Sequence, residues 1–241
     1  LAVAQDTVVS TSGSSGTPAV VVSTQQVREA FEKRFPGIGL SEVSTTQYPG
    51  LFEIRIGTDL LYVDGEVNYV LQGSLIDART RTDVTAERRA DLARVDFATL
   101  PLKDAIKQVK GDGSRVMAVF EDPNCGYCKM LHRNLKEIDN VTIYTFLFPI
   151  LSPDSHERSR NIWCASDPAL AWRSWMLEGT QPAAAECETP IESNLALGRK
   201  LMVTGTPAII FADGSRVNGA LPADALEQKL AQVAQKVARA R

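Results

Sequence analysis

The chain has 241 residues, of which 44% are hydrophobic and 23% are charged, so its length fits one large domain or two small ones and its composition argues against wholesale disorder. A formal net charge of -3 gives no reason to expect nucleic acid or an anionic membrane as a partner. No apolar run approaches the roughly 18–20 residues that span a bilayer, and two His residues in all exclude a multi-histidine metal site.

The N-terminus has features of an exported protein. The chain starts at Leu1 rather than Met, and Ala2-Val3-Ala4 before Gln5 has the small-x-small form of a signal-peptidase site. We expect these first residues to be the remnant of a removed signal peptide, the alternative being an ordinary Ala-rich start. Because residues 10–18 are rich in Ser, Thr and Gly, residues 1–19 are predicted to form a flexible tail.

Residues 20–81 predict a small α+β domain. After a capping Ser23 or Thr24, apolar residues with helical spacing extend to Pro36, namely Val27, Phe31 and Phe35. Period-two alternation around residues 52–56 then predicts a strand, and Asp64-Gly65-Glu66 predicts a hairpin turn between strands at 60–63 and 67–71. Because a core of about 60 residues is marginal, we expect this domain to pair with another surface, such as a second copy of itself.

Residues 82–99 predict a connecting helix. Asp83 and Glu87 give the helix an acidic start, and Leu92 and Val95 form only a thin apolar stripe. A helix this polar is mostly solvated, as is typical of a linker between two domains.

Residues 100–241 alternate between helical and strand patterns, which predicts an α/β domain. Helical spacing of Leu102, Ala105, Ile106 and Val109 predicts a helix that ends at Gly111. Strands are predicted at 116–120, 141–148 and 208–211, the last in a hairpin with 216–218. Further helices are predicted at 131–138, 155–165, 169–177 and 191–201, and from residue 222 to the end.

The most informative motif is Cys125-Gly126-Tyr127-Cys128, which follows an apolar strand and begins a helix. Free backbone N–H groups and the helix dipole favour a thiolate at the first cysteine, and such motifs lower the thiol pKa into the range of about 3.5–7.5. We therefore predict Cys125 to be the exposed attacking thiol and Cys128 the more buried resolving thiol. The alternatives are an inert disulfide, or a zinc site that adds His132 and one of the two distant cysteines to this pair.

Two further cysteines, Cys164 and Cys187, have 22 residues between them and belong to no CxxC motif. A disulfide between them would stabilise the fold by roughly 3–3.5 kcal/mol on the chain-entropy model and would indicate an oxidising compartment. Two buried free thiols are the alternative. Gly205-Thr206-Pro207 precedes the strand at 208–211, and composition leaves both the cis and the trans proline open.

Several segments together resemble the DsbC family of bacterial periplasmic disulfide isomerases, in the thioredoxin superfamily. The resemblance covers about residues 20–233 and rests on the order of the predicted elements and on residues 69–73, 125–132, 162–165, 196–198 and 203–208. It implies an α+β N-terminal dimerisation domain, followed by an α/β thioredoxin-fold domain with a helical insertion at about 149–201.

The resemblance also implies roles for particular residues. Thr206 and Pro207 would form a cis-proline loop beside Cys125 and would contact substrate together with Tyr127, while Cys164 and Cys187 would form a structural disulfide. The family acts as a V-shaped homodimer in the periplasm on misoxidised or unfolded proteins, and a membrane thiol reductant of the DsbD type keeps it reduced. No cofactor, metal or nucleic acid is implied.

The chain departs from the family pattern at one position and in one segment. Thioredoxins carry a buried acid six residues before the first cysteine, where this chain has Val119. Glu121 and Asp122 lie closer to the motif and are expected outside the core, without a role in proton relay. The predicted helix at 102–109 has no counterpart that we could match.

The function predicted from these patterns is disulfide isomerisation and reduction through the Cys125–Cys128 dithiol, with chaperone-like binding of clients. Three alternatives stay open: a thiol oxidase of the same superfamily, a holdase without thiol chemistry, and an inert exported domain with two structural disulfides.

Overall fold

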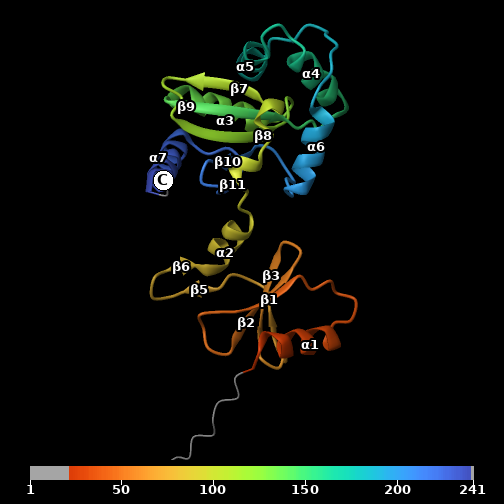
Figure 1. Cartoon of the computed structure of the whole chain (residues 1–241), viewed down its shortest axis with the longest axis vertical. Helices are drawn as coiled ribbons and strands as arrows, with labels where there is room; N and C mark the ends of the chain where they lie inside the picture. Colours follow the sequence, from red (N-terminus) through yellow and green to blue (C-terminus); the bar gives the residue numbers. More distant parts are fainter. Residues whose placement is uncertain (1–21, 240–241) are drawn as a thin grey trace, which may run out of the picture. The chain divides into compact units, whose positions relative to one another are not determined.

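The computed structural model describes residues 22–239 and separates them into two compact units, one that ends at Arg89 and one that starts at Ala90 (Figure 1). The predicted tail or signal remnant at 1–19 lies outside the described residues. Each unit has its own core and is described separately. The mixture of an α+β unit and an α/β unit confirms the predicted fold class.

The first unit is a helix packed beside a four-stranded antiparallel sheet (Figure 1). The helix α1 begins after the N-cap residue Ser23, whose side chain forms a capping box with Gln26. Its apolar face meets the sheet in a core that contains Val27, Phe31, Phe52, Ile54, Val63 and Val67. The elements of this unit are α1 (Thr24–Arg34), β1 (Glu42–Thr45), β2 (Leu51–Ile56), β3 (Asp59–Asp64), β4 (Val70–Leu71), β5 (Ile76–Asp77) and β6 (Thr82–Asp83).

Strand β4 is shorter than the predicted strand at 67–71. Val67 is 2% exposed and has a left-handed φ of 57°, so its side chain enters the core and the strand starts only at Val70. Because β4 is the last strand in the order β1-β2-β3-β4, it forms an edge of the sheet. This edge is apolar and open: Tyr69 is 79%, Val70 41% and Leu71 51% exposed.

The helix α2 (Val84–Leu92) is mostly exposed, as predicted for the connecting helix. One side of its first turns is nevertheless anchored in the first unit. Thr85 is fully buried and its hydroxyl lies 2.6 Å from that of Tyr62, and Arg88 donates to Glu53 at 2.9 Å. Val95, in contrast, belongs to the core of the second unit. The chain therefore leaves the first unit within α2.

The second unit is built on a five-stranded sheet of order β11-β10-β8-β9-β7, in which only β8 and β9 are parallel. Its strands are β7 (Ile106–Lys110), β8 (Arg115–Glu121), β9 (Val141–Leu147), β10 (Ala208–Phe211) and β11 (Arg216–Asn218). Alternate residues of β8 face opposite sides of the sheet. Met117 and Val119 pack with residues of α3 (Gly126–Asn134) and α7 (Ala223–Arg239), whereas Ala118 and Phe120 pack with Phe146, Phe148 and Val203.

Three helices fill the connection from β9 to β10, as the resemblance implied. They are α4 (Pro153–Trp163), α5 (Pro168–Glu178) and α6 (Ile191–Lys200), and Figure 1 shows α5 next to β7. Pro at the first helical position begins α4 and α5. Three short 3₁₀ turns complete the second unit, at Phe97–Thr99, Leu102–Asp104 and Leu135–Glu137.

The predicted helix at 102–109 is wrong. A single 3₁₀ turn at Leu102–Asp104 is followed by the strand β7, which pairs antiparallel with β9. Only Ala105 and Ile106 of the supposed apolar helix face are buried, and Val109 is 55% exposed. The free edge of β9 offers a complete backbone ladder, which outweighs the helical spacing of these apolar residues.

Candidate active site

The Cys125–Cys128 motif lies where β8 ends and α3 begins. Asp122 O accepts the backbone N–H of Cys125 at 3.1 Å and so closes the short loop after Glu121. Cys125 is the N-cap residue of α3, and its sulfur accepts the backbone N–H of Cys128 at 3.3 Å. Both cysteines are free thiols in this structure. The first sulfur is therefore held at the positive end of a helix by the motif's own backbone.

The surroundings of Cys125 favour its thiolate. The Cys128 side chain, the Thr206 hydroxyl and the backbone N–H groups of Cys128 and Tyr127 lower the pKa of Cys125 to about 6, although burial opposes them. In the thiol form, the S–H of Cys125 points to the carbonyl oxygen of Thr206 at 3.2 Å. A thiol of this acidity is largely ionised at neutral pH, which makes it both a nucleophile and a good leaving group.

Cys128 has the opposite acid–base character. It is fully buried, and burial raises the pKa of Cys128 well above its usual value, with further increases from Cys125 and from the negative charge of Glu121. The two sulfurs of one motif therefore differ in ionisation: the surroundings favour the thiolate of Cys125 and the protonated thiol of Cys128.

The prediction that Cys125 is exposed is wrong: the residue is only 4% exposed. Its sulfur packs against the Thr206 carbonyl, in the loop before β10. A partner that reaches this sulfur must therefore also contact the loop. Tyr127, by contrast, is 66% exposed and lies open to a partner at the surface of α3.

The loop that faces Cys125 contains a cis peptide bond between Thr206 and Pro207. The Pro207 carbonyl accepts the N–H of Gly219 at 2.7 Å, which ties the loop to the residue after β11. The hydroxyl of Thr206 is buried and makes no hydrogen bond to the described part of the chain in the thiol form. It is thus free to donate to a Cys125 thiolate. The structure brings Cys125, Thr206 and Pro207 together, as the resemblance implied.

The expectation that Glu121 and Asp122 lie outside the core is wrong, because both are fully buried. The carboxylate of Asp122 accepts the backbone N–H groups of Ile150 and Leu151 at 2.7 and 2.9 Å and the hydroxyl of Ser155 at 2.8 Å. It thereby fastens the segment before α4 to the loop that carries Cys125. Hydrogen bonds from the fold, rather than solvent, compensate this buried charge.

Glu121 belongs to a second buried polar group. Its Oε2 lies 3.0 Å from Nε2 of His132 and accepts the hydroxyl of Thr145 at 3.2 Å, while the Trp172 indole N–H donates to the same Nε2 at 3.1 Å. The sequence carried a signal for this group, since His132 follows Cys128 at i, i+4 on one helix face and an acid ends the preceding strand. The predictions used neither residue in this way.

Trp175 connects α5 with the active-site loop. Its indole N–H donates to the carbonyl of Pro123 at 2.6 Å. Two cations contact its ring, with Lys129 Nζ 4.4 Å and the Arg158 guanidinium carbon 4.1 Å from its centroid. These contacts place two positive charges on α3 and α4 near the motif.

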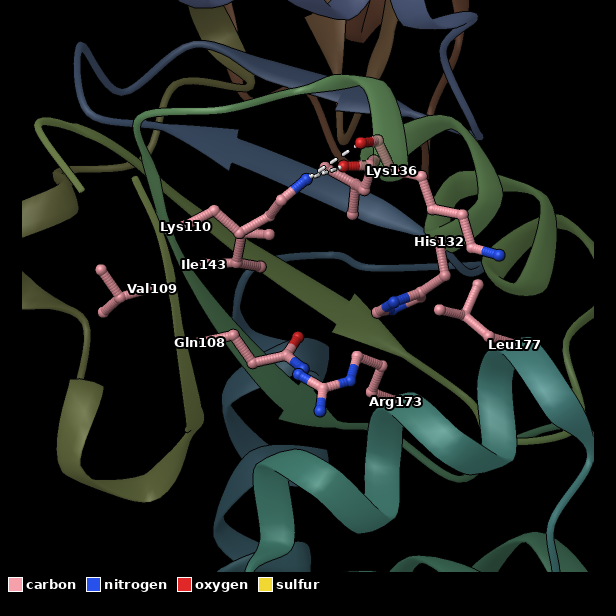
Figure 2. Close-up of a pocket in the computed structure, with 9 residues that line it drawn as sticks. Gln108, Val109, Lys110, His132, Lys136, Ile143, Arg173 and Leu177 are labelled. Carbon is pink, nitrogen blue, oxygen red and sulfur yellow. Dashed lines mark hydrogen bonds between the residues drawn. The ribbon is translucent and has the colours of Figure 1, made fainter. Parts of the chain in front are cut away.

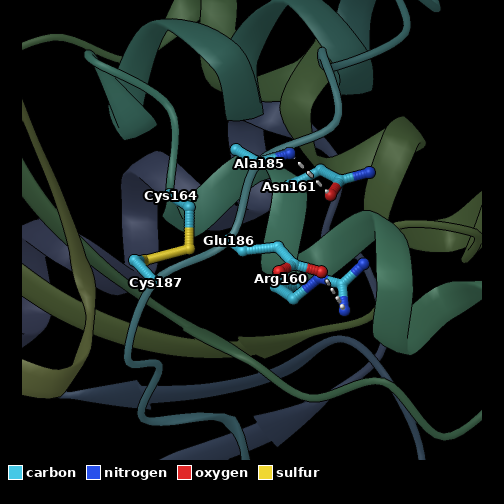
Figure 3. Close-up of a disulfide and its surroundings, with 6 residues drawn as sticks. All are labelled: Arg160, Asn161, Cys164, Ala185, Glu186 and Cys187. Carbon is cyan, nitrogen blue, oxygen red and sulfur yellow. Dashed lines mark hydrogen bonds and ion pairs between the residues drawn. A yellow bond between two sulfur atoms is a disulfide. The ribbon is translucent and has the colours of Figure 1, made fainter.

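Cys164 and Cys187 are joined by a disulfide, with the Cα atoms 5.6 Å apart (Figure 3). Cys164 ends α4, and Cys187 lies in the long irregular segment between α5 and α6. Ala185 N–H donates to Asn161 at 3.2 Å, and Arg160 lies 3.8 Å from Glu186. The disulfide and these two contacts hold the irregular segment against α4.

Among residues 22–239, no three His, Cys, Asp or Glu side chains gather as a metal site would require. Over the same range, no helix is sufficiently long and apolar to cross a membrane.

A strand–CxxC–helix unit with an acidic first cysteine, a buried second cysteine and a facing cis-proline loop, on this sheet, defines a disulfide oxidoreductase of the thioredoxin fold. Two family models match the chain: that of the disulfide bond isomerase protein N-terminal domain at residues 18–86 and that of a thioredoxin-like domain at residues 102–234. The chain belongs to the DsbC family of thiol:disulfide interchange proteins.

Particular relatives support this membership. The probable thiol:disulfide interchange protein DsbC of Bordetella parapertussis is 62% identical over 204 residues, which cover 85% of this chain and 73% of that protein. DsbC of Escherichia coli is 27% identical over 198 residues, or 80% and 82% of the two chains. The crystal structure of a disulfide interchange protein from Neisseria gonorrhoeae shares 35% identity with a TM-score of 0.55, and covers 56% of this chain and 99% of that chain.

Proposed function

We propose that this protein isomerises, and can also reduce, incorrect disulfides in exported proteins, with Cys125 as the attacking residue and Cys128 as the resolving residue. The observation that carries the proposal is the opposite acidity of the two thiols: the pKa of Cys125 is lowered to about 6, whereas burial raises that of Cys128. Cys125 attacks readily, whereas Cys128 can resolve the mixed disulfide only after it loses its own proton. This delay leaves time for the disulfides of the substrate to rearrange.

The reaction begins when the Cys125 thiolate attacks one sulfur of a substrate disulfide. A Cys125–substrate bond forms, the substrate disulfide breaks, and the second substrate sulfur leaves as a thiolate. In isomerisation that thiolate, or another in the substrate, attacks a different disulfide, and a substrate thiolate finally expels Cys125 without net redox change. In reduction Cys128 attacks Cys125 instead, so that the substrate gains two electrons and the motif becomes a disulfide.

The surface beside Cys125 supports a role in contacting clients for Tyr127, Thr206 and Pro207. Tyr127 offers an exposed ring, and the backbone of the cis-proline loop faces the sulfur. Ile150 and Leu151, which Asp122 fastens to the active-site loop, are 42% and 53% exposed. Exposed apolar side chains near a thiolate suit an unfolded protein as substrate, and they support chaperone-like binding.

The assembly and location belong to the same proposal. The open apolar edge at Tyr69–Leu71 supports pairing with a second copy, because an unpaired strand edge is a template for a partner strand. The disulfide between Cys164 and Cys187 supports an oxidising compartment, which for relatives of this family is the periplasm. A membrane thiol reductant of the DsbD type would return the oxidised motif to the dithiol.

Refolding of a scrambled multi-disulfide protein with catalytic amounts of this chain tests the proposal. Cys125→Ser should abolish the recovery of native client, because oxygen cannot take the place of the thiolate. A Cys164→Ser/Cys187→Ser double variant is the matched control and should keep catalysis. Recovery that survives Cys125→Ser would refute the proposal and favour a holdase, and catalysis only by the pre-oxidised protein would favour a thiol oxidase.

A further inference from the structure

The buried pair Glu121 and His132 has a hydrogen-bond arrangement that the dithiol mechanism above does not use. An indole N–H can only donate, so Trp172 faces a lone pair of His132 Nε2. The contact between Nε2 and Glu121 Oε2 contains one proton, which either atom can hold. The pair thus shares one proton, and the other carboxyl oxygen, Oε1, is buried without a hydrogen-bond partner in the described chain.

The pair lies next to the sulfur that must lose a proton. Cys128 and His132 are one turn apart on the buried face of α3, and the backbone N–H of Asp122, the residue after Glu121, faces the Cys128 sulfur. The charge of Glu121 is one of the causes that raise the pKa of Cys128. Because the Cys128 thiol is fully buried, its proton has to leave through a neighbouring protein group, and Glu121 is the carboxyl group that acts on it.

A cavity of about 160 Å³ is lined by His132 together with Gln108, Lys110 and Arg173. Figure 2 shows His132, Gln108 and Arg173 turned toward the space between them. Arg173 and Lys136 at this cavity are exposed, whereas His132 is only 5% exposed. The volume holds several water molecules, and the polar side chains that line it can bind them.

Several charged and titratable groups surround the pair. They are Cys128 on α3 and Cys125 at its N-cap, Asp122 after β8, Arg173 on α5, Lys110 on β7 and Lys136 after α3. The Lys110 ammonium is held by the carbonyls of Leu135 and Ile138. Lys110, Lys136 and Arg173 all line the cavity, so the charged groups at its wall are positive.

We propose that Glu121 and His132 relay the proton of Cys128 to the water-accessible cavity lined by Gln108, Lys110 and Arg173, and so control the resolving step. The inference rests on the proposed role of Cys128 as the resolving thiol. Glu121 and His132 are positioning residues here, because they act on substrate only through that sulfur.

The Cys128 thiol gives its proton to Glu121 Oε1 while Oε2 passes its own proton to His132 Nε2, and the imidazole releases a proton to cavity water. The Cys128 thiolate attacks Cys125 in the mixed disulfide, the bond between Cys125 and the substrate breaks, and the electron pair leaves on the substrate sulfur. The motif is oxidised by two electrons and the substrate disulfide is reduced by two.

Stopped-flow reaction of the reduced protein with an aromatic disulfide that releases thionitrobenzoate separates the two steps. Cys125 releases the first equivalent, and attack of Cys128 on the adduct releases the second. In Glu121→Gln the first release should be unchanged and the second should slow by about 10²-fold near pH 7. Its rate should then rise about tenfold per pH unit, as direct loss of the thiol proton to hydroxide requires. Glu137→Gln, the same change at an exposed residue, is the matched control.

The direction of the effect decides between two roles. If Glu121 only repels the Cys128 thiolate, removing its charge lowers the pKa of Cys128 and the second release becomes faster. A second release in Glu121→Gln that is as fast as wild type, or faster, therefore overturns the relay. A missing first release in the wild-type protein would instead refute Cys125 as nucleophile, which distinguishes failure of the proposed function from failure of the relay.

Two further measurements still test the relay if Glu121→Gln does not fold. His132→Gln keeps an acceptor for Trp172 but cannot shuttle a proton, and it should also slow the second release with the first unchanged. In the wild-type protein, the infrared difference spectrum between reduced and oxidised motif should contain a protonated-carboxyl band that shifts on oxidation. Absence of any carboxyl band in that spectrum would contradict a shared proton on Glu121.

Discussion

Two residues of the same type in one motif acquire opposite acidity from their positions. Cys125 caps α3 and receives hydrogen bonds at its sulfur, whereas Cys128 lies one turn later in the core. The lowered pKa of Cys125 could be predicted from the sequence, because a helix N-terminus after a strand is a local feature. The burial of Glu121 could not, because its partners Thr145 and Trp172 come from distant parts of the chain.

Alkylation of reduced protein by iodoacetamide should titrate with a midpoint near pH 6 at Cys125, located by mass spectrometry. The reactive thiolate is fully present above that pH and is lost as the pH falls through about 6. Thr206→Val removes one donor to the sulfur and should raise the midpoint. Thr204→Val, at an exposed position of the same loop, is the control. A wild-type midpoint near 8.5, the value of a free cysteine, would contradict this origin of the reactivity.

At the scale of elements, local patterns predicted most of the second unit. The apolar run before the motif predicted β8, and Pro or Gly residues marked the ends of several helices. Strand β7 was missed because its conformation depends on β9, more than thirty residues later in the chain, and not on its own helical spacing. The segment before α4 could likewise not be placed beside Cys125 from sequence, since buried Asp122 holds it there.

Removal of the second disulfide should affect stability and not chemistry. In a Cys164→Ala/Cys187→Ala variant the free energy of unfolding should fall by about 3 kcal/mol, since a loop of this length is no longer closed in the unfolded chain. Denaturant unfolding measures the loss, and the alkylation rate of Cys125 should stay at the wild-type value. Unchanged stability, or a Cys125 that no longer reacts, would show that the disulfide has another role.

Close packing of α6 on the sheet depends on Gly198. A Cβ at this position would overlap the ring of Phe148, so Gly198→Ala should lower the free energy of unfolding by about 1–3 kcal/mol. Gly39→Ala is the matched control, because nothing lies within 4 Å of its Cβ position, and it should change stability by less than about 0.5 kcal/mol. Thermal unfolding compares the two, and equal melting temperatures would contradict this packing.

At the scale of the whole molecule, isomerisation requires a surface that holds the client as well as a reactive thiol. A misoxidised client must stay bound while its disulfides exchange, and two active sites with apolar surroundings hold it better than one. The resemblance implied a dimer, and the first unit offers an open apolar edge at β4 that supports it. The sequence predicted this need for a partner from the small size of the first unit, although the strand that supplies the edge is shorter than expected.

Leu71→Glu should disrupt pairing through β4 and give a monomer, because a charge at a buried interface is left without compensation. The monomer should still reduce a simple disulfide and should lose isomerisation of a scrambled client. Ile76→Glu introduces the same charge at a residue that is also 51% exposed and should leave the dimer intact. Light scattering after gel filtration gives the masses. A wild-type monomer, or a dimer that survives Leu71→Glu, would contradict pairing through this edge.

Covalent trapping tests the central claim most directly. Cys128→Ala removes the resolving thiol, so incubation of the reduced variant with a scrambled client should accumulate a mixed disulfide, and peptide mass spectrometry should map the bond to Cys125. Reductant should release both proteins unchanged. If no adduct forms, or if the client is bonded to a different cysteine, Cys125 is not the attacking thiol.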